Sequence, residues 1–223
     1  MNDLALKTRE LIERVHASET MAVIVTAGAG SQALHDLMAV PGASRTVLEM
    51  LMPYGRSSLS DFLGYEPETT VGPDVAGDMA HRAYRRALRL RGDGSPVVGV
   101  GCTAAIVTDR IKRGTHRCHV EVWSSNGKTS YSLEMVKGLR DRAGEESTVS
   151  GLILRALVSG MLGESAVQVP LEDRECIDVR SVCYDDPIKA LLADHVESVR
   201  VDLDGTMTAD LPVAGGVLAG SFD

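Results

Sequence analysis

The chain has 223 residues, of which 44 % are hydrophobic and 24 % charged, and its formal net charge is −8. This composition predicts one folded domain, or one domain with a small appendage, and the negative charge argues against wholesale nucleic-acid binding. No stretch approaches the roughly 20 apolar residues that a membrane span needs, and the amphipathic N-terminus has no signal-peptide core. We therefore expect a cytoplasmic protein without nucleic-acid or membrane partners.

The cysteines show no CxxC or other metal-ligand spacing. They are Cys102, Cys118, Cys176 and Cys183. His116 and His119 flank Cys118, but no further cysteine pair or HExxH motif completes a zinc site. We expect free, mostly buried thiols in a reducing compartment, and neither a bound metal nor a cofactor.

The first part of the chain has the order helix, strand, glycine-rich turn, helix. Leucines at helical spacing predict a helix over 4–16, and the apolar run MAVIVT (21–26) predicts a strand. The strand leads into the turn 26–31, after which QALHDLMAV predicts a helix closed by Pro41 and Gly42.

A second strand and two helices follow. Residues 46–54 are apolar and predict the strand, and 57–64 predict a short helix capped by Ser57 or Ser58. Residues 74–90 have the pattern of a strong amphipathic helix. We interpret its basic face as solvated surface, and this face carries Arg82, Arg85, Arg86 and Arg89.

The middle of the chain predicts the rest of the sheet. Residues 96–107 begin as a buried strand, and 118–136 alternate polar and apolar residues around Asn126-Gly127, a hairpin-turn signal. A further helix is predicted over 148–162. Strands interleaved with helices, plus one hairpin, predict an α/β fold with three layers (α/β/α), in which helices cover both faces of a mixed sheet.

The composition changes after Gly163, where the chain becomes acidic and irregular. Residues 199–211 then predict a second hairpin, and an apolar run follows it. We place a boundary near residue 165. The main domain then spans 1–165, and 166–223 form a short C-terminal extension that is small to fold alone.

The turn Thr26-Ala-Gly-Ala-Gly-Ser31 is the leading candidate for a ligand pocket. Gly28 and Gly30 allow a ligand to approach the backbone, and free N–H groups at the start of a helix attract anions. A plain strand-to-helix connection has the same pattern, so spacing alone leaves both interpretations open.

Two basic segments are candidates for an anion contact. The run IKRGTHR predicts a short loop. This loop is either solvated surface or, if it faces the glycine turn, a binding site for a phosphate or carboxylate through charge-assisted hydrogen bonds. Its basic residues are Lys112, Arg113, His116 and Arg117. Arg140 and Arg142 lie beside acidic residues. They either form surface ion pairs with these residues or contact a phosphate.

Residues 26–65 read TAGAGSQALHDLMAVPGASRTVLEMLMPYGRSSLSDFLGY. This run resembles the C-terminal domain of the CinA family, the nicotinamide-nucleotide amidohydrolases, which carries a stretch like AESCTGG…PGSS…YSNxxK…LG. The match runs without gaps across Gly30, Pro41-Gly42, Ser44, Tyr54 and Leu63-Gly64. Looser matches continue through VGPDVAGDMAHRA and VGVGCTA, so the resemblance covers roughly 5–163. It implies a CinA-like form of the three-layer fold, and a homo-oligomer, since family members commonly self-associate.

The resemblance also shows where this chain departs from the family. The family's nucleophilic serine would fall at Ala27, and the lysine that activates it would fall at Leu59. The Ser/Thr of the family's SGIAG segment falls at Gly101. Amide hydrolysis by this route needs a hydroxyl and a base within hydrogen-bond reach. The inherited serine–lysine chemistry should therefore be absent.

We therefore expect a CinA-like domain that binds a pyridine nucleotide or a similar nucleotide and is not an active amidohydrolase. Tyr54 survives from the family pattern and either stacks on a ring or packs in the core. An arginine of the family's late GxR segment corresponds to Arg140 or Arg142. The expected ligand-binding residues are Thr26, Gly28, Gly30, Ser31, Tyr54, Gly101, Arg113 and Arg142.

An amidohydrolase with a relocated nucleophile is the alternative. Cys102 and Thr103 follow a buried strand where the family places its active-site loop, and Thr26 and Ser31 are further candidates. No base is identifiable for any of the four. The competing interpretation is that these residues fill a buried niche of small side chains.

A narrower resemblance is carried by the segments VTAGAGSQAL, VPGAS and KRGTHR. Some eukaryotic and bacterial proteins join a CinA-like domain with similar segments to a C-terminal nucleotidylyltransferase. The run VLAGSFD resembles the first strand and turn of such an enzyme, whose GSFDPxHxGH motif binds ATP phosphates. This implies that 166–223 are a linker and the incomplete start of a nucleotidylyltransferase-like domain. The chain would then act in NAD metabolism, as a nucleotide binder or as a scaffold for the covalently following domain.

Overall fold

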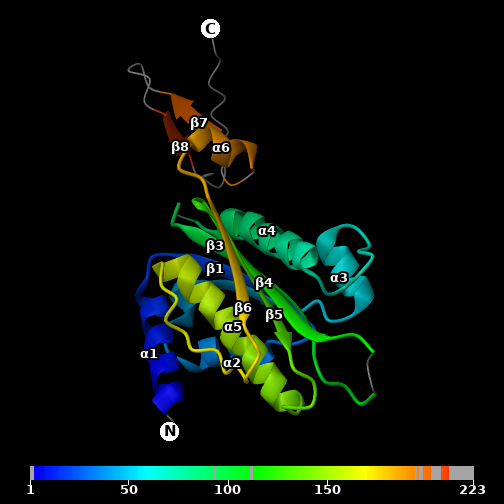
Figure 1. Ribbon diagram of the computed structural model, residues 1–223. Helices are drawn as coiled ribbons and strands as arrows, with labels where there is room; N and C mark the ends of the chain where they lie inside the picture. The colour runs from blue at the N-terminus through cyan, green and yellow to red at the C-terminus, as the bar shows by residue number, and fades with distance from the viewer. Residues whose placement is uncertain are drawn as a thin grey trace.

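The computed structural model describes residues 3–92, 94–110, 113–193, 195, 198–201 and 207–210. Strands and helices alternate along most of the chain (Figure 1). The helices are α1 (Asp3–Ala17), α2 (Ser31–Ala39), the 3-10 turn η1 (Ala43–Arg45), α3 (Arg56–Leu63), α4 (Pro73–Leu90), α5 (Arg142–Leu162) and α6 (Pro187–Leu192). The strands are β1 (Met21–Ala27), β2 (Val47–Leu51), β3 (Val97–Ala105), β4 (His116–Ser124), β5 (Gly127–Met135), β6 (Ile177–Cys183), β7 (Ser198–Val201) and β8 (Met207–Asp210).

Among the described residues, six strands form one mixed sheet in the order β2-β1-β3-β4-β5-β6. β1 is parallel to both of its neighbours, with Val25 opposite Leu51 of β2 and Gly101 of β3. The other pairs are antiparallel, and β4 and β5 form the hairpin predicted around Asn126-Gly127. β7 and β8 pair in a separate two-stranded sheet, which confirms the second predicted hairpin.

Helices cover both faces of the sheet, so the predicted three-layer α/β/α fold is confirmed (Figure 1). α1, α2 and α5 pack on one face, and α3 and α4 pack on the other. Alternate residues of β1 point to opposite faces. Ile24 therefore joins the core beneath α2 and α5, whereas Val23 and Val25 join the core beneath α3 and α4. A strand buried on both faces needs a continuous apolar run, which MAVIVT supplies.

The start of α3 differs from the prediction. The helix begins at Arg56 and Gly55 is its N-cap, with no side chain accepting from the free backbone N–H groups. Neither Ser57 nor Ser58 caps it, because both lie inside the first turn. Gly64 ends the helix in the left-handed conformation, at a φ of 71°.

The starts of α5 and β4 also differ from the prediction. α5 begins six residues before the predicted 148, because Asp141 accepts a hydrogen bond from the backbone N–H of Gly144 at 2.8 Å and caps the helix there. The predicted loop of the IKRGTHR run is shorter than expected, since His116 and Arg117 already belong to β4. Lys112 lies outside the described residues.

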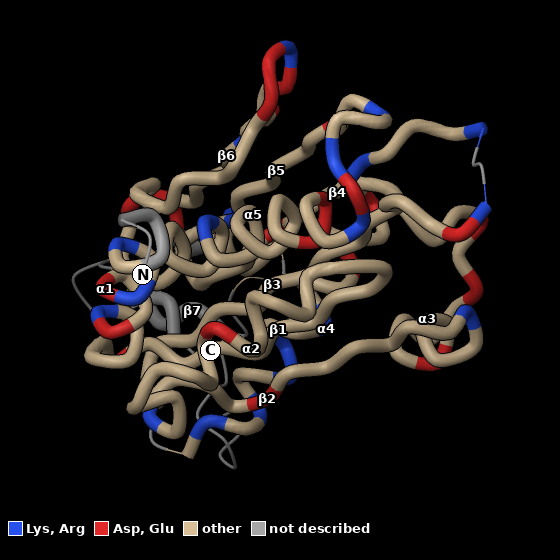
Figure 2. The backbone as a smooth tube through the Cα atoms, turned by 90° about the horizontal axis from the view of Figure 1, so that it is seen from below, with Lys and Arg blue, Asp and Glu red and all other residues tan. Residues whose placement is uncertain are grey.

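β6 extends the six-stranded sheet after the change of composition near residue 165. Beyond β6, α6, β7 and β8 lie at one end of the molecule (Figure 1). The run VLAGSFD (217–223) lies outside the described residues. Lys and Arg are interspersed with Asp and Glu along the chain (Figure 2). None of the described helices has the length and apolar character that crossing a membrane requires.

Candidate functional site

A cleft of about 310 Å³ lies where β1 and β3 end. It is lined by Ala27, Gly28, Tyr54, Arg56, Leu59, Thr70, Val71 and Ala104. These residues come from four segments: the end of β1 and the turn after it, the loop after β2 with α3, the loop before α4, and the end of β3. Four segments that converge at the carboxyl ends of two parallel strands are an arrangement typical of ligand sites.

The topology explains why the cleft forms at this point. β1 lies between β2 and β3, its parallel neighbours. The chain passes from β1 to β2 through α2 on one face, and from β2 to β3 through α3 and α4 on the other. The two connections diverge at the end of β1. Such a switch point leaves a crevice at the carboxyl ends of the strands, where open α/β sheets bind their ligands.

Gly28 is fixed by the close approach of β1 to β3. Its φ is 94°, in the left-handed region that favours glycine, and a Cβ at this position would lie 2.0 Å from the carbonyl oxygen of Ala104. A side chain at residue 28 would therefore collide with backbone. Both residues line the cleft, and Gly28 adds no side chain to it.

Tyr54 and Arg142, both predicted as ligand contacts, are brought together at the rim of the cleft. The Tyr54 side chain is 63 % exposed, so it lies open to a ligand instead of packing in the core. Arg142 donates to the hydroxyl of Tyr54 at 3.5 Å and to the backbone carbonyl of Val107. Arg56 adds a second cationic group, which donates to Glu66 across solvent-exposed surface. An aromatic ring and two guanidinium groups thus lie at the cleft or its rim.

The chain has no match among protein-family models or among curated proteins, but solved structures do match. The protein titled competence/damage-inducible protein CihA, from Agrobacterium tumefaciens, is 21 % identical, with a TM-score of 0.52 over 70 % of this chain and 93 % of that chain. A CinA superfamily protein from Enterobacter cloacae is 16 % identical, with a TM-score of 0.54 over 71 % and 92 %. One from Escherichia coli is 15 % identical, with a TM-score of 0.51 over 73 % and 92 %. The chain has a CinA-like fold.

The resemblance to the CinA family places a nucleophilic serine and an activating lysine at two positions of this chain. In the structure, both positions lie at the cleft. Ala27, where the serine would fall, is at the end of β1, and Leu59, where the lysine would fall, is on α3. Both line the cleft. They are 7 % and 2 % exposed, and both belong to the core beneath α3 and α4. A methyl group and an isobutyl group at these positions provide neither a nucleophile nor a base.

The start of α2 is already occupied by a carboxylate of the chain. Oε1 of Glu146, from the first turns of α5, accepts hydrogen bonds from the backbone N–H of Gly30 at 2.9 Å and of Gln32 at 3.3 Å. It also accepts from the hydroxyl of Ser31 at 2.8 Å. These groups formed the predicted anion cradle, and Glu146 satisfies them as a helix cap from another element. The sequence gives no signal for this contact, since 116 residues separate Gly30 from Glu146.

Three of the four candidate nucleophiles are buried, whereas Ser31 is exposed, and none of the four lines the cleft. Thr26 has no exposed surface, and its hydroxyl donates to the backbone carbonyl of Ala29. Cys102 lies within β3 on the opposite face of the sheet from Leu59, and burial raises the pKa of its thiol to about 12. Thr103, also within β3, donates to the carbonyl of Gly72 at 3.3 Å and has no exposed surface.

Of the eight predicted ligand residues, Gly28 and Tyr54 line the cleft and the other six do not, Gly101 and Arg113 among them. Gly101 faces α4, where a Cβ would lie 2.3 Å from the backbone nitrogen of Ala80, so this glycine lets the helix pack directly on β3. Arg113 is exposed on the loop before β4. Its neighbour Arg117 reaches the rim instead, donating to the carbonyl of Val71 at 3.2 Å. Arg140, the alternative to Arg142, forms an ion pair with Glu175 at 2.7 Å.

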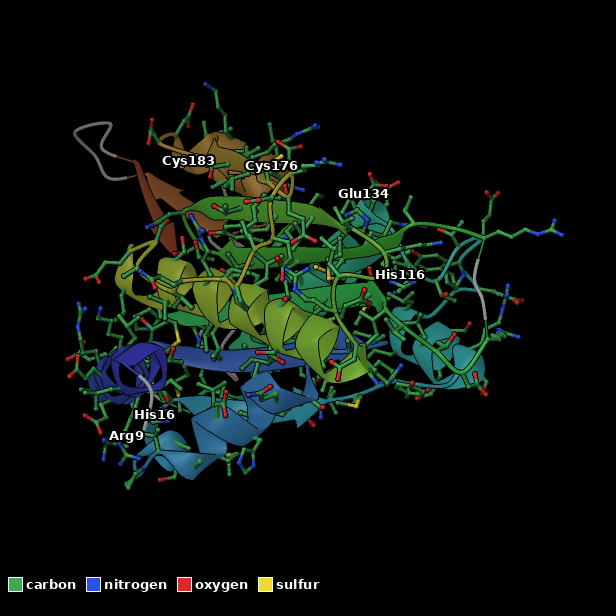
Figure 3. The ribbon with its side chains drawn as sticks, turned by 60° about the horizontal axis from the view of Figure 1, so that its bottom comes forward. Arg9, His16, His116, Glu134, Cys176 and Cys183 are labelled. Carbon is green, nitrogen blue, oxygen red and sulfur yellow. The ribbon has the colours of Figure 1, made fainter. Side chains whose placement is uncertain are left out.

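A buried pair that sequence reasoning missed supports the rim. Nδ1 of His116 lies 2.7 Å from Oε1 of Glu145, which has no exposed surface (His116 is labelled in Figure 3). Oε2 of Glu145 accepts from the backbone N–H of Val107 at 2.8 Å, and the carbonyl of Val107 accepts from Arg142. Glu145 therefore holds the backbone segment that positions Arg142.

All four cysteines are free, but only Cys102 and Cys118 are buried. Cys176 and Cys183 are exposed, before β6 and at its end (Figure 3), so the expectation of mostly buried thiols holds for half of them. The described residues contain no cluster of three or more His, Cys, Asp or Glu side chains that could hold a metal ion.

Proposed function

We propose that this chain is a CinA-like domain that binds a pyridine nucleotide or a similar nucleotide without hydrolysing it. The observation that carries the proposal is that Ala27 and Leu59 line the cleft in which Tyr54 is exposed. The volume, about 310 Å³, is within the usual range of small-molecule sites. The shape of a ligand site is retained there, but the side chains are not those of a serine–lysine hydrolase.

The groups at the cleft match the parts of a mononucleotide. The Tyr54 ring is placed to stack on a pyridine or other base, and the apolar surface of Leu59 borders the same space. Arg142 and Arg56 offer charge-assisted hydrogen bonds to a phosphate. The cradle at the start of α2 is not part of this proposal, because Glu146 fills it.

Isothermal titration tests the proposal with three probes: nicotinamide mononucleotide, nicotinate mononucleotide and ADP-ribose. We expect binding of at least one, weakened about tenfold by Arg142→Gln, since a hydrogen bond to a charged group contributes about 1.5–3 kcal/mol. Tyr54→Ala should weaken it several-fold. Tyr65→Ala is the matched control, because Tyr65 is also an exposed tyrosine but does not line the cleft. Absence of binding by all three probes would contradict the proposal and leave only the scaffold role.

The alternative function is amide hydrolysis by a relocated nucleophile. The burial of Thr26 and Cys102 and the raised pKa of the Cys102 thiol weigh against it, because an unionised thiol away from the cleft cannot attack a ligand bound there. An ammonia-release assay separates the two functions. Turnover of nicotinamide mononucleotide that is abolished by Cys102→Ala or Thr26→Val would replace our proposal with this alternative.

We further propose that residues 166–223 form a linker and the start of a nucleotidylyltransferase-like domain, for which the CinA-like part, 1–165, is a scaffold, and that the chain self-associates. The support for the domain proposal is the sequence resemblance of VLAGSFD and of the KRGTHR segment, and the support for self-association is the resemblance to the CinA family. Sedimentation velocity of the full chain tests self-association, which a monomeric species at all concentrations would contradict. Reading the gene past Asp223 tests the domain proposal, and a continuation without Pro-x-His-x-Gly-His would contradict it.

A further inference from the structure

A second cavity, of about 350 Å³, lies on the other side of the sheet from α3 and α4. α1, α2 and α5 enclose it together with the segment that follows α5. Its apolar walls include Ile12, Leu154 and Val167, each 3 % exposed. Figure 3 shows α1, marked by Arg9 and His16, beside α2 at this side of the molecule. The cavity is separate from the cleft at the end of β1, with which it shares no lining residue.

Ser150, a residue that lines this cavity, has a buried hydroxyl without a partner among the residues described. Ser150, on α5, is 2 % exposed, and its Oγ has no hydrogen-bond partner in the part of the chain that the structure describes. The neighbouring Thr148 behaves differently, since its hydroxyl lies within hydrogen-bond distance of the carbonyls of Gly144, at 3.1 Å, and Pro170, at 3.2 Å. A buried hydroxyl without a partner carries a desolvation cost of about 1–3 kcal/mol. A ligand that hydrogen-bonds Ser150 would remove this cost.

An unpaired carboxylate lines the same cavity. Asp36, on α2, is partly buried and forms no hydrogen bond or ion pair with any residue that the structure describes. Burial raises its pKa, and the only opposing influence is the charge of the neighbouring His35. Arg9 also lines the cavity, but its guanidinium donates to Glu13 at 3.1 Å. Asp36 therefore has no cationic partner among the described residues, and its carboxylate is partly withdrawn from water.

We propose that this cavity binds a small primary amine with an apolar substituent, whose ammonium group contacts Asp36 and Ser150. An ammonium group has three N–H donors, which the carboxylate and the hydroxyl oxygen can both accept. The apolar walls bury the hydrocarbon part. Asp36 would repel an anionic ligand, and a neutral ligand would leave the negative charge of Asp36 unpaired.

Part of the cavity's wall lies outside the segment that resembles the CinA family. Val167, Gln168 and Pro170 form part of its wall and lie beyond residue 163, where the sequence resemblance ends. Pro170 is fixed by hydrogen bonds to its carbonyl from Thr148 and Arg140. The wall is thus a defined part of the fold and not a loose tail. The amine site would stand even if the cleft at β1 bound no nucleotide.

Benzylamine is the probe that tests this proposal, by isothermal titration of the full chain at pH 7. We expect binding in the millimolar range or tighter, with benzyl alcohol and benzoate at least tenfold weaker. Asp36→Asn should weaken benzylamine at least tenfold, and Ser150→Ala about threefold or more, with melting temperatures confirming that both variants fold. Asp61→Asn, an exposed aspartate on α3, is the matched control and should change nothing.

Backbone amide chemical shifts then locate the site. Benzylamine should shift the amides of Gly151, Val167 and their neighbours around this cavity, and Arg142→Gln should leave its affinity unchanged. No binding, equal binding of benzyl alcohol, an unchanged affinity in Asp36→Asn, or shifts confined to the cleft around Tyr54 would each overturn the proposal. The measurements on Arg142→Gln also distinguish failure of the amine proposal from failure of the nucleotide proposal.

Discussion

The ion pair between Arg140 and Glu175 offers a sharp test of how the segment after α5 is held. Glu175 has no exposed side-chain surface, and Arg140 has 8 %. Nη1 and Nη2 of Arg140 each donate to one carboxylate oxygen of Glu175 at 2.7 Å. The backbone N–H groups of Val136 and Glu172 donate to the same carboxylate at 2.8 and 2.9 Å. The pair connects the loop before α5 with the segment that leads into β6.

The size of the effect follows from the pKa of Glu175. Burial alone would raise this pKa, but the hydrogen bonds from Arg140 and from the backbone of Glu172 and Val136 lower it from 4.5 to about 2. Each pKa unit corresponds to about 1.4 kcal/mol, so the carboxylate contributes about 3 kcal/mol to the free energy of unfolding at pH 7. Because the folded pKa is depressed, this stability is present above about pH 4.5 and is lost as the pH falls toward 2.

Glu175→Gln should therefore lower the free energy of unfolding by about 3–5 kcal/mol at pH 7, since it leaves the Arg140 guanidinium buried without its counter-charge. Urea denaturation at pH 7 and at pH 3 measures the difference between the two proteins. By pH 3 the native protein should have lost about 2 kcal/mol of its advantage over the variant, because most of the carboxylate's contribution lies above that pH.

The control is Glu164→Gln. Glu164 also forms an ion pair, with Arg14, but both side chains are substantially exposed. Exposed pairs contribute little, so this variant should have nearly the stability of the native protein at both pH values. If Glu175→Gln also stays within about 0.5 kcal/mol of the native protein, or if its difference does not shrink between pH 7 and pH 3, the assignment of a buried charge pair here is wrong.

Three further predictions concern other parts of the fold. Gly28→Ala should lower the free energy of unfolding by at least about 2 kcal/mol in a urea titration, because its Cβ would lie 2.0 Å from the carbonyl of Ala104; native-like stability would contradict this contact. With an aromatic disulfide reagent at pH 8, Cys176 and Cys183 should react in the folded protein and the two buried thiols only in denaturant, so a third fast thiol would refute the burial. Glu146→Ala should cost about 1–2 kcal/mol by removing the cap of α2, whereas an unchanged midpoint would show that the cap contributes nothing.

The layers of the fold are predictable from the sequence because most elements bury at least one face. β1 and α4 are recognisable from an apolar run and from an amphipathic pattern, and both lie where predicted. β6 is not predicted, and the reason is its place at the edge of the sheet. Its residues after Ile177 are all exposed, and the apolar alternation of Ile177 and Val179 does not continue at Ser181. The early start of α5 is missed because the charged residues of its first turns conceal the cap at Asp141.

The site is predictable where it depends on spacing and unpredictable where it depends on tertiary contacts. The ungapped resemblance identifies Ala27, Tyr54 and Leu59, and the structure gathers all three at one cleft. It gives no hint that Glu146 occupies the start of α2, because that contact joins α2 to α5 across the core. The support that Glu145 gives to Arg142 through Val107 is hidden for the same reason.

The cleft at the end of β1 depends on topology and backbone, and hardly at all on the side chains that would react in it. The connections through α2 and through α3 and α4 diverge there whatever residue stands at 27. The backbone of Gly28 forms one wall through its approach to Ala104, and α3 forms another through Leu59. Under the proposed function, alanine and leucine at the positions where the resemblance places a serine and a lysine remove the chemistry without removing the space, and the buried leucine adds apolar surface to the core beneath α3 and α4. A fold of this kind can therefore lose catalysis and keep a ligand site, which is why titration with nucleotides, rather than an activity assay alone, decides what this chain does.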